Sequence, residues 1–188
     1  PIPGEYTVRI KDNEGKGTGF PRIYFHNMFS FDPQKALTIE QWGTGKWTSM
    51  ENAFYACHNM SVVATDAPDL SNATSLAGMF NQVGVYSGWN TFTSFNNWDT
   101  STITNMQETF RDTNVANLEI SNWDTSNVTN MKGMFNRAVN LYSDIGGWDT
   151  SNVADMSEMF YYAEEFNQDI GGWNVPSLTD ATDMFTGV

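Results

Sequence analysis

The sequence has little cysteine, few basic residues and no long apolar run. It contains one cysteine, Cys57, so no disulfide can form within the chain. No apolar run is long enough to cross a membrane, which argues against direct membrane insertion of these residues. Lys and Arg number only nine against 22 Asp and Glu, giving a formal charge of −13. Because a phosphate backbone is bound by clustered Lys and Arg, this balance argues against a nucleic-acid partner.

The motifs that carry catalysis are missing too. The two histidines, His26 and His58, share no helical spacing or motif. There is no Gly-rich phosphate loop, no Gly-x-Ser-x-Gly and no His-Glu-x-x-His. These absences predict a protein that is not an enzyme and needs no cofactor, with calcium left open as a ligand.

What the sequence does have is a repeat. The stretch NWDTSNVTNMKGMF at residues 122–135 returns as NWDTSTITNMQETF at 97–110, GWDTSNVADMSEMF at 147–160 and GWNVPSLTDATDMF at 172–185. Aligned on the final Phe, the chain holds six repeats, which end their motifs at Phe54, Phe80, Phe110, Phe135, Phe160 and Phe185. A fixed period of this length is typical of stacked repeat architectures.

Within each repeat the hydrophobic periodicity changes. Leu118 and Ile120 alternate with polar residues, which predicts a short strand with one buried face. After the polar turn, the apolar residues take steps of three, three, one and three, which fit one face of a short helix: Val128, Met131, Met134, Phe135 and Ala138. The sequence therefore predicts an α/β repeat solenoid, leucine-rich-repeat-like, with about six repeats of 25 residues.

The beginning of the chain follows another pattern. Residues 5–10 and 21–27 have the composition of two strands, joined by a Gly-rich turn. We therefore expect an N-terminal β-hairpin cap at residues 1–35, which would cover the open end of a solenoid at residues 36–188. We expect the two parts to form one folded unit that is a segment of a larger protein.

The repeat also has a family resemblance. The stretches WDTSNVTNMKGMFNRA at 123–138 and FNQDIGGWNVPSLTDATDMF at 166–185 resemble the repeat of BspA-like leucine-rich-repeat surface proteins, a type also found in mycoplasma surface lipoproteins. The resemblance covers about residues 37–188, with departures at Pro68 and Pro176. It implies a bacterial adhesin or other surface protein, extracellular or on the cell surface, that binds a protein or peptide. It implies no reaction and identifies no ligand residue.

The first candidate site follows from the expected solenoid. Outward residues of its strands would line a concave face, where partners of such proteins bind: Glu40, Ser94, Asn96, Glu119, Ser121, Asp144 and Asp169. This face is small and acidic, which suits a basic or polar ligand. It has no aromatic anchor, so a plain solvated sheet explains the pattern equally well.

A second candidate lies in the insertion between the second and third repeats. Tyr86, Trp89 and Phe92 fall in a stretch rich in Gly and Ser, where aromatic side chains suit contact with a peptide or sugar. The alternative is that these rings fold back onto the core.

A third candidate is the aspartate of the WDTS motif, present as Asp99, Asp124 and Asp149. Carboxylates in one row repel each other unless turn N–H groups satisfy them or a cation is shared. An Asx-type turn explains the pattern without a ligand, whereas a calcium site would make these residues metal ligands.

Three functions follow from these patterns. The first is a non-enzymatic surface module that binds a protein or peptide, on a host or neighbouring cell. The alternatives are a structural spacer without a ligand and a module that binds calcium or carbohydrate. Cys57 belongs to none of them, because its position after the repeated Phe carries mostly small apolar residues, which predicts a buried thiol.

Overall fold

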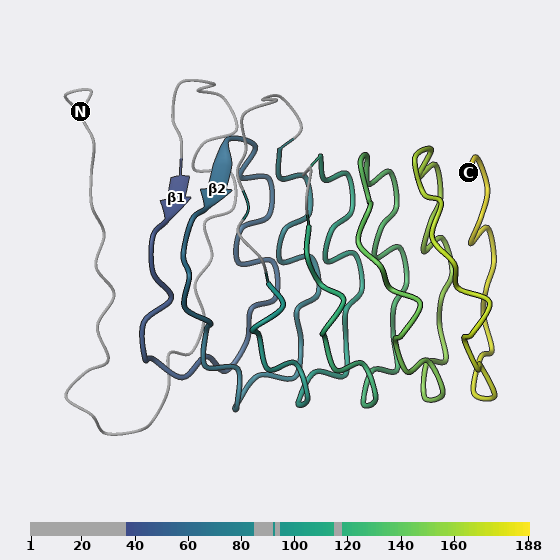
Figure 1. Cartoon of the computed structure of the whole chain (residues 1–188), viewed down its shortest axis with the longest axis horizontal. Coiled ribbons are helices and arrows are strands. Elements are labelled where there is room, and N and C mark those ends of the chain that lie inside the picture. Colours follow the sequence, from purple (N-terminus) through teal and green to yellow (C-terminus); the bar gives the residue numbers. More distant parts are fainter. Residues whose placement is uncertain (1–36, 85–91, 93–94, 115–117) are drawn as a thin grey trace.

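The repeats lie side by side as successive coils of chain. A computed structural model describes residues 37–84, 92, 95–114 and 118–188, and Figure 1 shows their coils in one row, from β1 at one end to the C-terminal coil at the other. We call this row the repeat stack. Strands β1 (Leu37–Ile39) and β2 (Met60–Val62) pair in parallel and in register. Isolated parallel bridges extend the same arrangement, as between Asn105 and Asn130 and between Asn130 and Asp155.

The predicted α/β solenoid of leucine-rich-repeat type is wrong. Within the described ranges the chain has no helix, and β1 and β2 are its two strands, each of three residues. The strand predicted at residues 117–123 is described from Leu118, and from there it consists of turns and irregular backbone. The helix predicted at 128–138 does so too, apart from the isolated bridge at Asn130.

Backbone geometry explains why no helix forms in the fourth repeat. Gly133 and Arg137 have φ angles of 56° and 53°, in the left-handed region that a right-handed helix does not allow. The N–H groups of Gly133 and Phe135 donate to the carbonyls of Ser157 and Met159 in the next coil, at 2.8 and 2.9 Å. A helix would instead direct each N–H to the carbonyl four residues earlier.

Other N–H groups of this repeat form hydrogen bonds that close short turns. Met134 donates to the carbonyl of Met131, and Ala138 donates to that of Phe135. Each turn spans four residues, and Gly133 and Arg137 stand third in them, where a type II turn requires positive φ. Such turns bring every third residue to the same side of the chain, which is why the apolar spacing resembles that of a helix.

A ladder of phenylalanine rings forms the centre of the stack. Neighbouring rings lie 5.7–5.9 Å apart between centroids, with planes within 13° of parallel: Phe54, Phe80, Phe110, Phe135, Phe160 and Phe185. Trp98 and Trp123 stack beside the ladder at 6.0 Å. Offset stacking of this kind adds about 0.5–1.5 kcal/mol per pair to the burial of the rings.

Several buried polar groups find partners in neighbouring coils. The Thr125 hydroxyl donates to the carbonyl of Asp149 at 2.9 Å, and the Trp123 indole N–H donates to the carbonyl of Phe95 at 3.0 Å. A buried donor left without an acceptor costs about 1–3 kcal/mol, so these bonds fix the register of one coil on the next. Residues 1–35, the predicted β cap, lie outside the described part of the chain.

Candidate functional site

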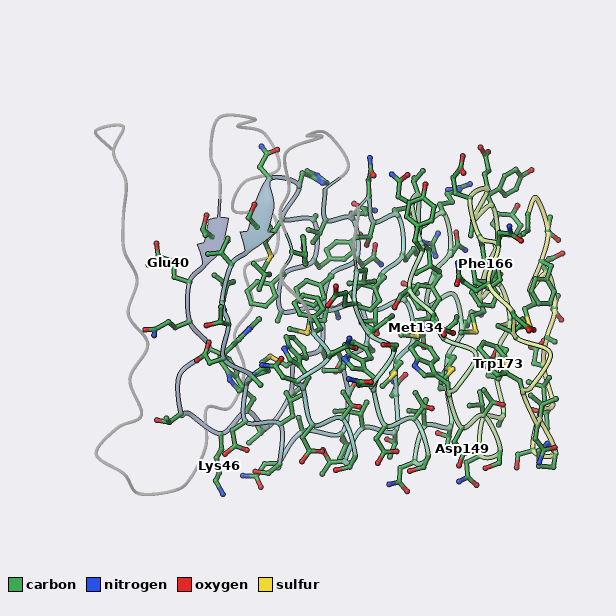
Figure 2. All side chains as sticks on the ribbon, in the orientation of Figure 1. Glu40, Lys46, Met134, Asp149, Phe166 and Trp173 are labelled. Carbon is green, nitrogen blue, oxygen red and sulfur yellow. The ribbon has the colours of Figure 1, made fainter. Side chains whose placement is uncertain are left out.

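The aspartates of the WDTS motif are held in turns. Asp99, Asp124 and Asp149 each accept the backbone N–H of the serine two residues later, at 3.1, 3.0 and 2.9 Å. Each therefore forms an Asx-type turn. Figure 2 shows Asp149 along the same lower border of the stack as Lys46.

These turns affect acidity. Hydrogen bonds from the Ser101 hydroxyl and backbone N–H lower the pKa of Asp99, and those from Ser151 lower the pKa of Asp149 in the same way. A donated hydrogen bond stabilises the ionised carboxylate, so both groups stay charged at neutral pH. Among the described residues, no three His, Cys, Asp or Glu side chains gather closely enough to hold a metal ion. Calcium binding at these aspartates stays the untested alternative to an Asx turn.

The insertion between the second and third repeats is described at Phe92 alone among its three candidate aromatics. The Phe92 ring is 6% exposed and packs edge-on against Phe80 and Phe95, at 5.7 and 5.6 Å. Phe92 therefore belongs to the core, as the alternative interpretation of this loop holds. Tyr86 and Trp89 lie outside the described residues, as does Ser94.

Three candidates of the expected concave face recur at one position in consecutive repeats. Glu119, Asp144 and Asp169 are 25 residues apart, and all three are exposed. We call them the acidic row. The Asp144 and Asp169 carboxylates accept the N–H groups of Gly146 and Gly171, at 3.0 and 2.9 Å, which fixes their orientation. The acidic row therefore presents one exposed carboxylate per repeat, and backbone N–H groups of glycines hold two of the three.

The remaining described candidates of that face lie in two different places. The Ser121 hydroxyl and the backbone N–H of Asn122 both donate to the Asn96 amide oxygen, at 3.3 and 3.0 Å, so Asn96 and Ser121 bind each other. Glu40 is exposed and follows β1, at the other end of the stack from the C-terminal coil (Figure 2). Because no helix layer backs this surface in the described chain, the predicted concave face of leucine-rich-repeat type is wrong as architecture.

Sequence reasoning missed an exposed aromatic residue beside the acidic row. Tyr142 is 54% exposed, whereas Leu141 and Ile145 are buried. Tyr142 and Asp144 are both exposed, with the half-buried Ser143 between them in the sequence. The alternation of Leu141, Tyr142 and Ser143 in the sequence could have indicated this exposure. Comparison between repeats could not, because the matching residue of the next repeat is Asn167 and not an aromatic residue.

A second exposed aromatic group follows Phe160, in the fifth repeat. Tyr161 and Tyr162 meet edge to face at 4.7 Å, and the Arg137 guanidinium lies 6.0 Å from the centre of the Tyr161 ring. Tyr162 is 45% exposed. Its ring also lies so close to Gly187 that any side chain there would collide with it. Part of this aromatic surface thus packs on the next coil.

The thiol of Cys57 is buried and unreactive. Cys57 is 1% exposed, which confirms the prediction of a core thiol, and burial raises the pKa of Cys57 to about 12. A thiol with this pKa stays protonated and unreactive at neutral pH. His58 is also buried, and its Nδ1 donates to the carbonyl of Gln82 at 2.8 Å.

No helix in the described part of the chain is both long and apolar enough to traverse a bilayer. Comparison with known proteins found no match among curated proteins and none among solved structures. A family model described as "Mycoplasma protein of unknown function, DUF285" matches residues 23–88 and 74–188. This supports the mycoplasma side of the resemblance noted in the sequence, while a BspA-like leucine-rich repeat is not shown. Since the two matches together span most of the sequence, the chain belongs to the DUF285 family.

Proposed function

We propose that this chain is a non-enzymatic, surface-located module that binds a basic segment of another protein along the acidic row. The observation that carries the proposal is the row itself: three exposed carboxylates at one position of consecutive repeats, two of them fixed by backbone N–H groups. Carboxylates already held in place lose little conformational freedom when a cationic partner binds.

Charge and an aromatic anchor support the same partner. The formal charge of −13 attracts a basic segment and speeds its encounter with the chain. Tyr142 beside Asp144 supplies a large, rigid contact of the kind that is enriched in protein interfaces. A location on the cell surface, where such a partner would be met, agrees with the family match and is part of the proposal.

The test compares two triple variants of equal charge. The first is Glu119→Gln, Asp144→Asn and Asp169→Asn in the acidic row. The control is Asp99→Asn, Asp124→Asn and Asp149→Asn in the WDTS turns. Binding of a short Lys- and Arg-rich peptide is measured by calorimetry, with a Glu-rich peptide of equal length as the negative probe.

We expect the acidic-row triple to lose roughly tenfold in affinity, because three exposed ion pairs together contribute about that much. The control triple should lose far less. Equal losses would show that only net charge matters, and no measurable binding by the unmodified chain would favour the structural spacer instead.

A further inference from the structure

Two exposed apolar side chains lie three residues apart in the fourth repeat. Val139 is 45% exposed and Tyr142 is 54% exposed. The Tyr142 hydroxyl donates to the amide oxygen of Asn140 at 3.1 Å, which holds the end of its side chain beside the residue that follows Val139. We call Val139 and Tyr142 the apolar pair.

The repeat stack does not require apolar residues at these positions. The repeats on either side carry polar residues instead: Asn114 and Glu164 at the position of Val139, and Asn117 and Asn167 at that of Tyr142. Asn114 forms an isolated parallel bridge with Val139, so a polar residue fits this backbone equally well. Because core packing does not explain the apolar pair, a contact with a partner is the better explanation for it.

The ring of Tyr142 is positioned before any partner binds. Its hydroxyl is bound to Asn140, and the Asn140 amide group donates in turn to the Asn114 amide oxygen of the preceding coil at 2.9 Å. A side chain that is already held in place loses little conformational freedom on binding. The exposed part of the Tyr142 side chain is therefore a prepared contact surface.

The charged groups around the apolar pair are mostly acidic. Asp144 follows Tyr142 by two residues and is exposed. Glu164 and Glu165, also exposed, stand one repeat after Val139 and its neighbour Asn140. The guanidinium of Arg137, the nearest basic residue in the sequence, lies 6.0 Å from the centre of the Tyr161 ring in the next coil. Since Asp144 belongs to the acidic row, the apolar pair continues the surface proposed for a basic partner.

We propose that the apolar pair binds an apolar side chain of that partner, which is therefore an amphipathic cationic segment with an apolar residue beside its Lys or Arg. This inference rests on the proposed function, because the basic residues of the segment pair with the acidic row. A neutral apolar segment would gain nothing from the carboxylates of Asp144 and its neighbours. A purely polar basic segment would leave Val139 and Tyr142 uncovered.

The test compares two basic peptides of equal length and charge, binding to the full chain in a calorimeter. Both carry the same Lys and Arg residues, and the remaining positions are Ser in one peptide and Leu in the other. We expect the Leu peptide to bind roughly tenfold more tightly, because covering the apolar pair removes apolar surface from water. A peptide with Leu and Glu probes general stickiness and should not bind.

A double variant places this difference on the apolar pair. Val139→Asn with Tyr142→Asn gives the fourth repeat the residues that the third repeat has at these positions, so the stack should persist, as a thermal melt verifies. The variant should bind the Leu and Ser peptides with equal affinity, while its affinity for the Ser peptide stays that of the parent. The control is Val63→Asn, which changes a side chain that is 40% exposed in an earlier repeat and should keep the tenfold difference.

The outcomes separate this inference from the proposed function. If the Ser peptide binds and the Leu peptide binds no more tightly, the inference fails and the proposed function stands. Absence of binding by either basic peptide would overturn both. A tenfold difference that survives in the double variant would place the apolar contact elsewhere and overturn the inference alone.

Discussion

At the residue scale, Trp123 shows how much one buried aromatic residue contributes. Its side chain is 3% exposed, stacks on Trp98 at 6.0 Å and donates its indole N–H to Phe95 at 3.0 Å. We expect Trp123→Ala to lower the free energy of unfolding by about 3–5 kcal/mol, because it leaves a cavity and an unpaired carbonyl.

Urea titration measures this change, and Tyr142→Ala is the matched control. Tyr142 is 54% exposed, so its loss should alter stability by no more than about 0.5 kcal/mol. A Trp123→Ala chain as stable as the parent would contradict the stacked core.

Adjacent glycines offer a second prediction at this scale. A Cβ at Gly146 would collide with the backbone carbonyl of Asp169 in the next coil, whereas one at Gly147 meets nothing within 4 Å. We expect Gly146→Ala to destabilise the fold by about 1–3 kcal/mol, since a backbone group must move.

Gly147→Ala should be neutral or slightly stabilising, because alanine reduces the freedom of the unfolded chain. Thermal unfolding of both variants tests the pair. Similar behaviour of the two would mean that the coils are not packed as closely at this point as the structure has them.

At the element scale, the Asx turns link stability to pH. The pKa of Asp149 lies below its ordinary value of 3.8 because the Ser151 hydroxyl and N–H bind the ionised carboxylate. A group whose pKa is lower in the folded state contributes stability above its unfolded pKa and loses it as pH falls through the folded pKa. The same holds for Asp99 with Ser101.

We therefore expect the urea concentration at the midpoint of unfolding to decrease as the pH is lowered from about 5 to about 2. In Asp149→Asn the amide oxygen still accepts the Ser151 N–H but no longer titrates, so the decline with pH should be shallower. A decline of unchanged slope would assign the pH dependence to other carboxylates.

At the scale of the whole molecule, the calcium alternative can be tested directly. Asp99, Asp124 and Asp149 each satisfy a separate serine N–H, so an Asx turn accounts for every one of them without a metal. We expect the same unfolding temperature in calcium and in EDTA at matched ionic strength. A large rise specific to calcium would mean a cation bound preferentially to the folded state.

The sequence by itself determined the period, the buried residues and the polar turns, since hydrophobic burial and Asx chemistry are local consequences of residue type. Phe110, Phe135 and Phe160 are buried as the alignment predicts, and Cys57 lies in the core. The position of the acidic row also follows from the repeat, although the exposure of Tyr142 beside it does not.

Only the tertiary structure decided where the backbone hydrogen bonds go. A spacing of three suits both a helix and a series of four-residue turns, so Met131 and Met134 face inward in either case. The choice depends on whether the N–H of Phe135 finds an acceptor four residues earlier or in the neighbouring coil. That acceptor, the carbonyl of Met159, exists only once the coils are stacked, which is why periodicity alone pointed to a helix.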